Sequence, residues 1–451
     1  MAKGADPLPV VEPDQTYATV TARISDITLG RPSSSWWLGF MLSLAGVGLL
    51  LVAIGYLFYA GVGIWGVNTT VVWGYAIASY VWWIGIGNAG TLISAMLYLT
   101  RQDWRTSINR FAEAMTLFAA AIAGLYPILH LGRPYLFYWL VPYPDIMQVW
   151  PQPRSPLVWD FFAIASYLIV SLLFWYTGLI PDLATLRDRA QSRGKQLFYG
   201  MLALGWRGSA RHWARHERAY RLLAAMAVPL VVSVHSVVGY DFSVGIAPGW
   251  RETIFSPYFV VGAMFSGFAM VVTLTILLRA AFKLQPFVTL RHLDNMAKIL
   301  VAGSLLMGYA YGMEIFTAWY SGDRYEWSTI MNQFVGPYAP LYWIMLFCNV
   351  LASQIFWFTF ARRSLLILFL VSIVVNIGMW LERFLIVVNT LSHDFLPSSW
   401  RLFYPTFWDW ATLAGTFGLF AALFFLFARF IPLVPMHEMR RLIKEKEGER
   451  P

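Results

Sequence analysis

Long hydrophobic runs separated by short polar segments fill most of the chain from residue 36 onward. Ten of these runs are long enough to cross a bilayer as α-helices, which takes about 20 apolar residues. The run from 71 to 99 contains no Asp, Glu, Lys or Arg and is too long for a buried strand. The pattern therefore predicts an all-α integral membrane protein with ten transmembrane helices, at 36–60, 71–99, 110–130, 157–179, 221–240, 255–281, 296–320, 338–361, 364–389 and 408–431.

The polar segments divide the chain into an N-terminal tail at 1–35, a ten-helix transmembrane domain at 36–432 and a C-terminal tail at 433–451. The longest loop, 180–219, is expected to be partly helical and to lie on the membrane surface. Only 13% of the residues are charged, whereas a soluble protein has about a quarter. No polar segment is large enough to hold an active site of its own.

The basic residues are distributed unevenly between the two sets of loops. If both termini lie in the cytoplasm, 27 of the 33 Lys and Arg residues fall on the cytoplasmic side. The opposite loops carry Arg133, Arg154, Arg251, Arg324 and Arg401, and the remaining one, Arg383, lies inside the ninth span. This asymmetry agrees with the positive-inside rule, so the net charge of +9 reflects membrane topology and indicates no nucleic-acid binding.

The segment "WWIGIGNAG" contains Gly85, Gly87 and Gly90 in the G-x-G-x-x-G spacing that binds dinucleotides. That motif needs a short strand before it and an amphipathic helix after it, within a βαβ unit. Here both flanks are uncharged and hydrophobic, so the glycines belong to a membrane helix. They are expected to allow close helix packing or to leave room for a flat ligand, not to bind a nucleotide.

Several classes of cofactor are excluded by composition. The single cysteine, Cys348, cannot form a disulfide framework or a cysteine-ligated zinc or iron–sulfur site within this chain. Only His130 and His235 lie in predicted spans, whereas an electron path through two bis-histidine haems needs a further pair. We therefore expect no metal, haem or iron–sulfur cluster in this chain.

Ionisable residues inside a bilayer are costly and commonly functional. Most of those in or directly next to the predicted spans fall near the outer face: His130, Asp160, His235, Asp241, Glu314, Glu382 and Arg383. Each alone has a structural explanation. Asp160 could complement a helix N-terminus, and Arg383 could pair with Glu314 or Glu382. In the inner half the sequence offers Glu113, three residues after a possible partner, Arg110.

Their common depth suggests a shared function. A His, an Asp and an Arg at one depth could hold a two-electron, two-proton carrier whose hydroxyl groups must be hydrogen-bonded and deprotonated. Because His130 and Asp160 end and begin consecutive spans, they are expected to be close together. Arg383 is expected either to keep Asp160 ionised or to stabilise negative charge that develops on the quinol oxygen. Apolar walls rich in Trp, Phe and Met suit an isoprenoid quinol that enters from the lipid.

Four stretches, "GIGNAGTLISAMLYLTRQDWRTSINRFAEAMT", "YPILHLGRPYLFYWLVPYP", "RSPLVWDFFAIASYL" and "FWYTGLIPDLATLRDRA", resemble the polysulfide-reductase-type (NrfD-like) quinol-interacting membrane subunits. Within that family the chain is most similar to the C-type membrane subunit of bacterial alternative complex III. The resemblance is dense from about Trp73 to Arg189 and looser afterwards, where "WLERFLIVVNTLSHDFLP" fits the same type. The paralogous F-type subunit of that complex shares the fold and stays an alternative.

The resemblance implies two four-helix bundles, spans two to five and six to nine, with two flanking helices. It also implies a multi-pass subunit of a quinol oxidoreductase in the bacterial cytoplasmic membrane. A quinol, expected to be menaquinol, would be oxidised near the outer face. Electrons would pass to an iron–sulfur subunit and then to multi-haem and mono-haem cytochrome c subunits, beside a paralogous membrane subunit and lipid.

By motif, the resemblance assigns the quinol site to His130, Asp160 and Arg383. Gly87, Asn88 and Gly90 are candidates for the wall of the site, although members often have His where this chain has Asn88. If oxidation is coupled to proton translocation, the path would use the remaining ionisable groups: Glu113, His235, Asp241, Glu314 and Glu382. Competing functions are an ion or solute transporter and a purely structural anchor for a redox partner.

Overall fold

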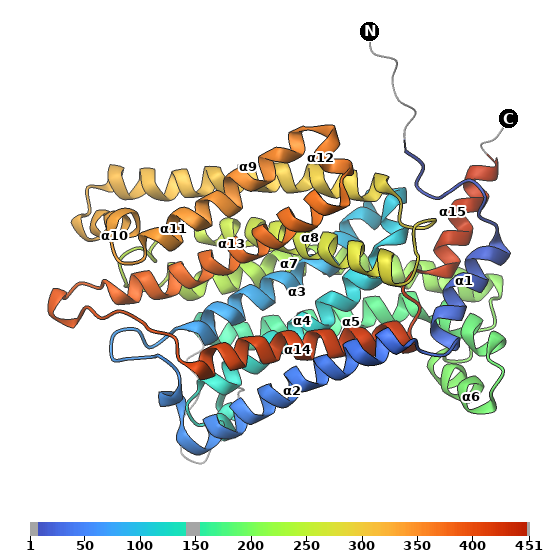
Figure 1. The fold of residues 1–451 in the computed structure, drawn as a ribbon, viewed down its shortest axis with the longest axis horizontal. Helices are drawn as coiled ribbons and strands as arrows, with labels where there is room; N and C mark the ends of the chain where they lie inside the picture. The colour runs from blue at the N-terminus through green and yellow to red at the C-terminus, as the bar shows by residue number, and fades with distance from the viewer. Residues whose placement is uncertain (1–7, 141–153, 449–451) are drawn as a thin grey trace, which may run out of the picture.

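The computed structural model describes residues 8–140 and 154–448, and within them it contains helices and no strand. The helices are α1 (Tyr17–Leu29), α2 (Ser34–Ala60), α3 (Tyr75–Leu99), α4 (Asn109–His130), α5 (Pro156–Arg189), α6 (Arg193–Leu202), α7 (Ala210–Ser243), α8 (Phe255–Ala281), α9 (Leu290–Ser321), α10 (Arg324–Val335), α11 (Ala339–Leu346), α12 (Thr359–Arg363), α13 (Leu365–Ser392), α14 (Phe407–Phe430) and α15 (Met436–Gly448). The long helices run side by side along the longest axis of the molecule (Figure 1).

The prediction of ten spans is confirmed: among the described residues, ten segments are long and apolar enough to cross a membrane. The eighth segment is not one regular helix. It begins as α11, continues as a π-helical turn at Phe347–Leu351 and ends in a 3₁₀ segment at Ala352–Trp357. Helices α5 and α7 extend beyond the expected spans, so much of the loop 180–219 is helical, together with α6.

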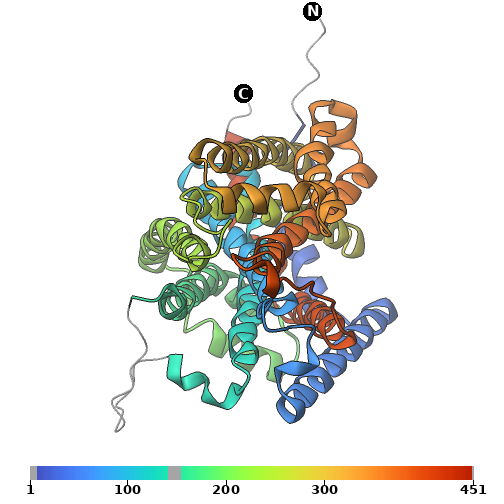
Figure 2. The ribbon, with the colours of Figure 1, turned by 90° about the vertical axis from the view of Figure 1, so that its left-hand side faces the viewer.

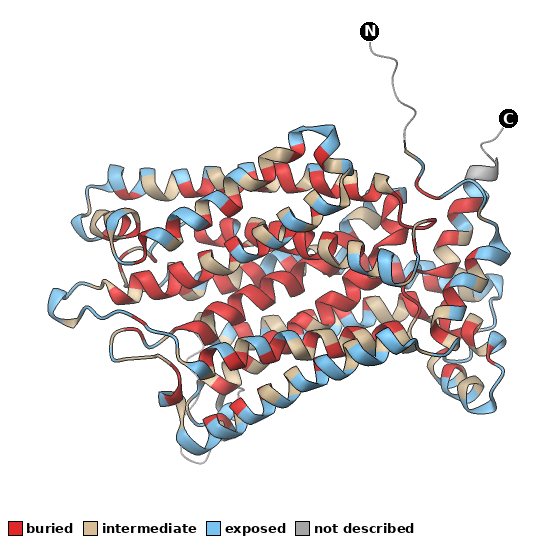
Figure 3. Ribbon diagram, in the orientation of Figure 1, coloured by how far each residue is buried: buried red, intermediate tan, exposed pale blue. Residues whose placement is uncertain are grey.

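Helix α3 occupies the centre of the molecule, and 20 of its 25 residues are buried. It contacts α4 and α7 of the first four-helix bundle (α3, α4, α5, α7) and α8 and α13 of the second (α8, α9, the composite eighth span, α13). Figure 2 looks along the helices and shows how they surround this centre, and Figure 3 shows buried residues concentrated there. The expected pair of bundles is therefore present.

The two remaining spans, α2 and α14, pack against each other and flank the bundles. Their contact is close because Gly46 and Gly418 face each other, and a Cβ atom added to Gly46 would lie 2.8 Å from the Cα of Gly418. Small residues allow helix backbones to approach in this way where lipid offers no hydrophobic driving force. Most of α2 stays exposed, so its outer side faces the membrane.

The glycines of α3 also serve close packing. A Cβ atom at Gly90 would collide with the carbonyl oxygen of Ala112 on α4, and one at Gly87 would lie 3.0 Å from the backbone nitrogen of Ala120. The α3–α4 contact is therefore formed backbone to backbone. This arrangement matches the predicted packing role of the motif. In the described chain the motif lies inside α3 and no strand precedes it, so it lacks the βαβ context of a dinucleotide site.

The first and last helices, α1 and α15, lie at the same end of the bundle, which we call the terminus end, and the opposite end is the distal end (Figure 1). An even number of spans requires this arrangement. The short helices α1, α6 and α15 cover the terminus end, whereas α10 lies at the distal end. The cytoplasmic location of the terminus end remains a prediction from the distribution of basic residues.

Candidate functional site

A pair of carboxyl groups lies near the distal end of the first bundle. Asp160, in the first turns of α5, accepts a hydrogen bond of 2.8 Å from the hydroxyl group of Tyr80 on α3. The carboxyl group of Asp241, near the end of α7, lies within hydrogen-bonding range of Asp160. Two carboxyl groups can share a hydrogen bond only if a proton lies between them. One oxygen of each has no donor among the described residues.

His130 is the last residue of α4 and lies near the same end. Its Nε2 atom is 3.3 Å from the carbonyl oxygen of Val72, and its ring stacks on Trp65 and meets the edge of Trp73. If Nε2 carries the proton and donates it to Val72, Nδ1 is an acceptor. The segment between α4 and α5 includes residues 141–153, which lie outside the described residues.

Arg383 lies in the distal part of α13, in the second bundle. Its Nη1 atom is 2.9 Å from Glu382 Oε1, so the expected pairing with Glu382 is present. Its guanidinium group also lies over the ring of Phe259, 4.1 Å from the centroid. The other oxygen of Glu382 accepts a 2.5 Å hydrogen bond from Tyr311, which itself accepts one of 2.7 Å from Asn349 in the π-helical turn.

The expected direct contacts among the three site residues are absent. Within residues 8–140 and 154–448, no hydrogen bond or ion pair joins any two of His130, Asp160 and Arg383. Arg383 pairs with Glu382 and does not contact Asp160, so the expectation that it keeps Asp160 ionised is wrong, whereas the alternative, that it stabilises charge on the quinol oxygen, stays a prediction. The membrane depth predicted from the sequence identified residues near one end of the molecule, but it could not show that they belong to different bundles.

Between these clusters lies a buried pair on α3 and α7. The side chain of Asn88 is 2.6 Å from His235 Nδ1, and both residues are almost fully buried. Asn88 Oδ1 and His235 Nε2 have no partner among the described residues. Gly85 leaves space beside the imidazole, since a Cβ atom there would lie 3.7 Å from Nε2. Asn88 therefore contacts His235, whereas Gly87 and Gly90 contact α4.

Acidic residues gather around the loop that joins α7 to α8 at the distal end. Glu326 accepts a hydrogen bond of 2.5 Å from the backbone nitrogen of Gly249, and Arg251 lies between Glu326 and Asp323. Burial and the negative charge of Glu326 raise the pKa of Glu252 to about 7. Glu314 on α9 interacts with both Glu252 and Glu382, so it lies between this loop and the Arg383 cluster.

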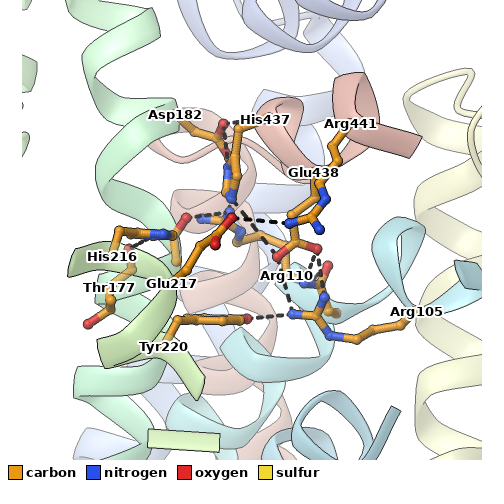
Figure 4. Close-up of polar contacts among 12 residues, drawn as sticks. Arg105, Arg110, Thr177, Asp182, His216, Glu217, Tyr220, His437, Glu438 and Arg441 are labelled. Carbon is orange, nitrogen blue, oxygen red and sulfur yellow. Dashed lines mark hydrogen bonds and ion pairs between the residues drawn. The ribbon is translucent and has the colours of Figure 1, made fainter. Parts of the chain in front are cut away.

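A second polar network lies at the terminus end of the first bundle, where the sequence had offered little besides Glu113 (Figure 4). Arg110 on α4 donates 2.9 Å hydrogen bonds to Asp182 and to the carbonyl oxygen of Gly178, both on α5. Glu113 does not pair with Arg110, which corrects the expected pairing. Instead it accepts hydrogen bonds from Ser94 and, at 3.1 Å, from Tyr220.

The C-terminal helix α15 completes this network. Glu438 accepts a 2.7 Å hydrogen bond from Arg105, which also donates to Tyr220. The backbone nitrogen and ring of His437 contact Asp182. Burial alone would raise the pKa of Glu438, but the positive charge of Arg105 holds that pKa below its ordinary value. Sequence reasoning missed the network because its members are far apart in the chain, and α15 had been assigned to a tail.

The described residues contain no group of three or more His, Cys, Asp or Glu side chains that could hold a metal ion. The arrangement can instead do proton chemistry. The Asp160–Asp241 pair with Tyr80 offers carboxyl oxygens to a hydroxyl donor, and His130 offers an imidazole from the neighbouring helix. The terminus-end network and the Arg383 cluster are each held together by ion pairs among their own members, although some of their buried atoms, such as Arg110 Nε and Asn349 Oδ1, have no hydrogen-bond partner among the described residues.

Comparisons with known proteins agree with this architecture. The family model described as polysulphide reductase, NrfD, matches residues 64–392, which is most of the chain. The chain is similar to a protein of Halobacterium salinarum named as the C membrane subunit of a dimethyl sulfoxide reductase, with 29% identity over 265 residues, or 58% of this chain and 55% of that protein. It is also similar to the C subunit of the selenate reductase of Mesobacillus selenatarsenatis, with 25% identity over 395 residues, or 84% and 89% of the two chains.

The first of these matches thus spans only about half the length of the relative, whereas the second spans most of it. Both relatives are named as reductase subunits, and one is named as a membrane subunit. The family match, ten apolar helices and an all-α fold point to the same class of oxidoreductase membrane subunit. This chain belongs to the polysulphide reductase, NrfD, family.

Proposed function

We propose that this chain is the quinol-oxidising membrane subunit of a respiratory oxidoreductase complex. Quinol oxidation releases two electrons and two protons, so the subunit must bind the quinol from the lipid and accept its protons. Electrons would leave to an iron–sulfur subunit docked at the distal end. A subunit of this kind in a reductase complex has a clear role, because a reductase consumes electrons that a lipid-soluble carrier can supply.

The observation that carries this proposal is the carboxyl pair of Asp160 and Asp241 beside Tyr80. Its two unpaired carboxyl oxygens fit the hydroxyl donor of a quinol, and the pair has capacity for one further proton. Tyr80 orients Asp160 through its 2.8 Å hydrogen bond. Because both carboxyl groups lie near the distal end, protons accepted there have a short route to that side of the membrane.

His130 would accept the second proton. The carbonyl oxygen of Val72 holds one ring nitrogen, and stacking on Trp65 fixes the plane of the ring. A neutral imidazole with one free acceptor nitrogen is a suitable base near neutral pH. Asp160 and His130 would thus contact the two ends of one quinol instead of each other. Arg383, neutralised by Glu382, would act indirectly, by ordering the adjoining second bundle.

Finer assignments also belong to this proposal. The motifs of the first bundle favour the C-type membrane subunit of an alternative complex III, with menaquinol as the donor and cytochrome c subunits as later carriers. The bacterial cytoplasmic membrane, with both termini in the cytoplasm, is the location that the basic residues favour. Glu113, His235 and Glu382 are buried and Glu314 is half-buried, so these four polar groups inside the spans are candidates for a proton path.

The proposal is tested by the quinol:acceptor activity of purified complexes that carry Asp160→Asn or His130→Ala. Each change should lower turnover by about 10²-fold or more, which is typical for a positioned acid–base group. Glu326→Gln is the matched control, since it alters a buried distal-end carboxylate that is held by Gly249 and Arg251 outside the first bundle. A denaturing gel of each complex verifies that all subunits have assembled. Near-normal turnover in both site variants would refute the assignment.

A structural anchor is the second candidate, and the Arg383 cluster favours it. Arg383, Glu382, Tyr311 and Asn349 bind one another, as expected of a network that only stabilises the bundle. The ultraviolet absorbance of an organic extract of the purified complex separates the two functions. Co-purified quinone supports quinol oxidation, whereas an intact, active complex whose extract contains no quinone and whose activity does not depend on added quinol supports the anchor.

A further inference from the structure

A long apolar groove runs between the flanking pair α2–α14 and the second bundle. Its volume is about 1030 Å³. Helix α14 lines it from Trp410 to Ala428, α8 from Met270 to Ala281, and α13 from Ile373 to Leu381. The flanking pair packs on α3 and α4 but makes no comparable contact with α8 or α13 in the described chain, which leaves this gap open. The carboxyl pair of the first bundle does not line the groove.

The walls of the groove suit flexible hydrocarbon chains better than another helix. They consist mainly of large side chains, such as Trp36, Trp82, Phe417 and Phe424. Interfaces between transmembrane helices instead favour small residues that let backbones approach, as Gly46 and Gly418 do between α2 and α14. The part of α8 that lines the groove covers about 16 Å at 1.5 Å per residue, close to the thickness of one leaflet, and the α14 wall continues beyond it to a length of about 27 Å.

At the terminus end the lining of the groove becomes polar, and exposed basic residues adjoin it in the sequence. Ser33 and Ser35, at the N-terminus of the 27-residue helix α2, belong to its lining. Arg31 lies two residues before Ser33, and Lys283 directly follows Phe282, which lines the opposite wall. Neither basic side chain has an ion-pair or hydrogen-bond partner within residues 8–140 and 154–448. The hydroxyl groups of Ser33 and Ser35 hydrogen-bond each other at 2.8 Å, and Ser33 also caps α2 through Trp36, so the basic residues Arg31 and Lys283 are the groups that suit a phosphate group here.

Other charged groups near the mouth are already engaged. Arg279, in the last turn of α8, donates to the carbonyl oxygen of Val288 and is approached by Glu12. Arg429, at the end of α14, donates to the carbonyl oxygen of Thr28. No Asp or Glu of the described chain belongs to the lining of the groove. The charged residues that adjoin the lining in sequence and have no partner in the described chain, Arg31 and Lys283, are therefore both positive and complement an anionic headgroup.

We propose that this groove binds one anionic phospholipid from the leaflet at the terminus end. Its acyl chains fill the space between α14 and the α8–α13 wall, and its phosphate group lies at the mouth, near Ser33, Ser35, Arg31 and Lys283. The lipid then joins the flanking pair to the second bundle across a gap that the protein's own side chains leave open. This site is separate from the proposed quinol site and does not depend on it.

The test is lipid retention by the purified complex in detergent, measured by native mass spectrometry after delipidation and re-addition of phosphatidylglycerol. One basic residue near an anionic group strengthens binding about fivefold, so Arg31→Ala with Lys283→Ala should weaken phosphatidylglycerol binding about thirtyfold. The matched control is Arg324→Ala with Arg401→Ala, which removes two exposed basic residues that lie toward the distal end of the molecule. This double variant should bind lipid like the unchanged protein.

A second variant tests the groove itself. Ala421→Trp places a bulky side chain in the space between α14 and α8, and it should abolish retention of the phospholipid while both basic residues remain. Equal phosphatidylglycerol binding by all variants would overturn the proposal. So would retention of phosphatidylcholine as strong as that of phosphatidylglycerol, or retention of a quinone in place of phospholipid.

Discussion

Asp182→Asn should release the C-terminal helix and destabilise the protein. Arg110 and Asp182 form an ion pair of 2.9 Å in which both side chains are at least 99% buried. Two other guanidinium nitrogens of Arg110 already have no partner among the described residues, so Asp182 is its main compensation. Asparagine would keep the shape but place a donor group opposite Arg110. Breaking a buried ion pair in this way typically costs about 3–5 kcal/mol.

Asp188→Asn is the matched control on the same helix, because its ion pair with Arg187 is exposed and should contribute at most about 1 kcal/mol. Thermal stability is measured as the fraction of monodisperse protein that survives heating in detergent. Asp182→Asn should also speed tryptic cleavage at Arg440 and Arg441, because the backbone of His437 is bound by Asp182. Equal melting and equal cleavage of the two variants would refute the role of this network.

Two further predictions follow from packing and charge. Gly90→Leu should reduce the yield and thermal stability of the complex, because the leucine side chain would collide with Ala112. The control Gly48→Leu on α2, where nothing lies within 4 Å of the added Cβ atom, should behave like the unchanged protein. Equal yields of the two variants would contradict the close α3–α4 contact. Glu252 has a pKa of about 7 in the folded protein, raised by burial and by Glu326, against an ordinary value of 4.5. Between these two pKa values the folded form keeps a proton on Glu252 that the unfolded form has lost, so the free energy of unfolding should fall as the pH rises from about 4.5 to 7. Glu252→Gln should weaken this pH dependence of stability. An unchanged pH profile of stability in the variant would refute the prediction.

The sequence predicted the membrane architecture well because hydrophobic length is a local property. Each span could be recognised without knowing its neighbours, and the glycines of "GIGNAG" were correctly assigned to a membrane helix. The irregular eighth span was not foreseen. Its π-helical turn, which contains Cys348 and Asn349, is apolar enough to be read as a continuous helix.

The candidate site was predictable only in part because its geometry depends on which helices meet. The membrane depth predicted from the sequence pointed to His130, Asp160 and Arg383. It could not show that Arg383 pairs with Glu382 while Asp160 binds Tyr80. The terminus-end network illustrates the same limit. Asp182 and His437 are separated by 255 positions, and nothing in the local sequence of either residue indicates their contact.

The most direct test of the central claim is a structure of the purified complex with a bound quinone-site inhibitor. The proposed function predicts inhibitor density near the distal end of the first bundle, within hydrogen-bonding distance of Asp160 or His130, and loss of that density in Asp160→Asn. Density beside Arg383 and Glu382 in the second bundle, or density unaffected by the Asp160 substitution, would contradict the account.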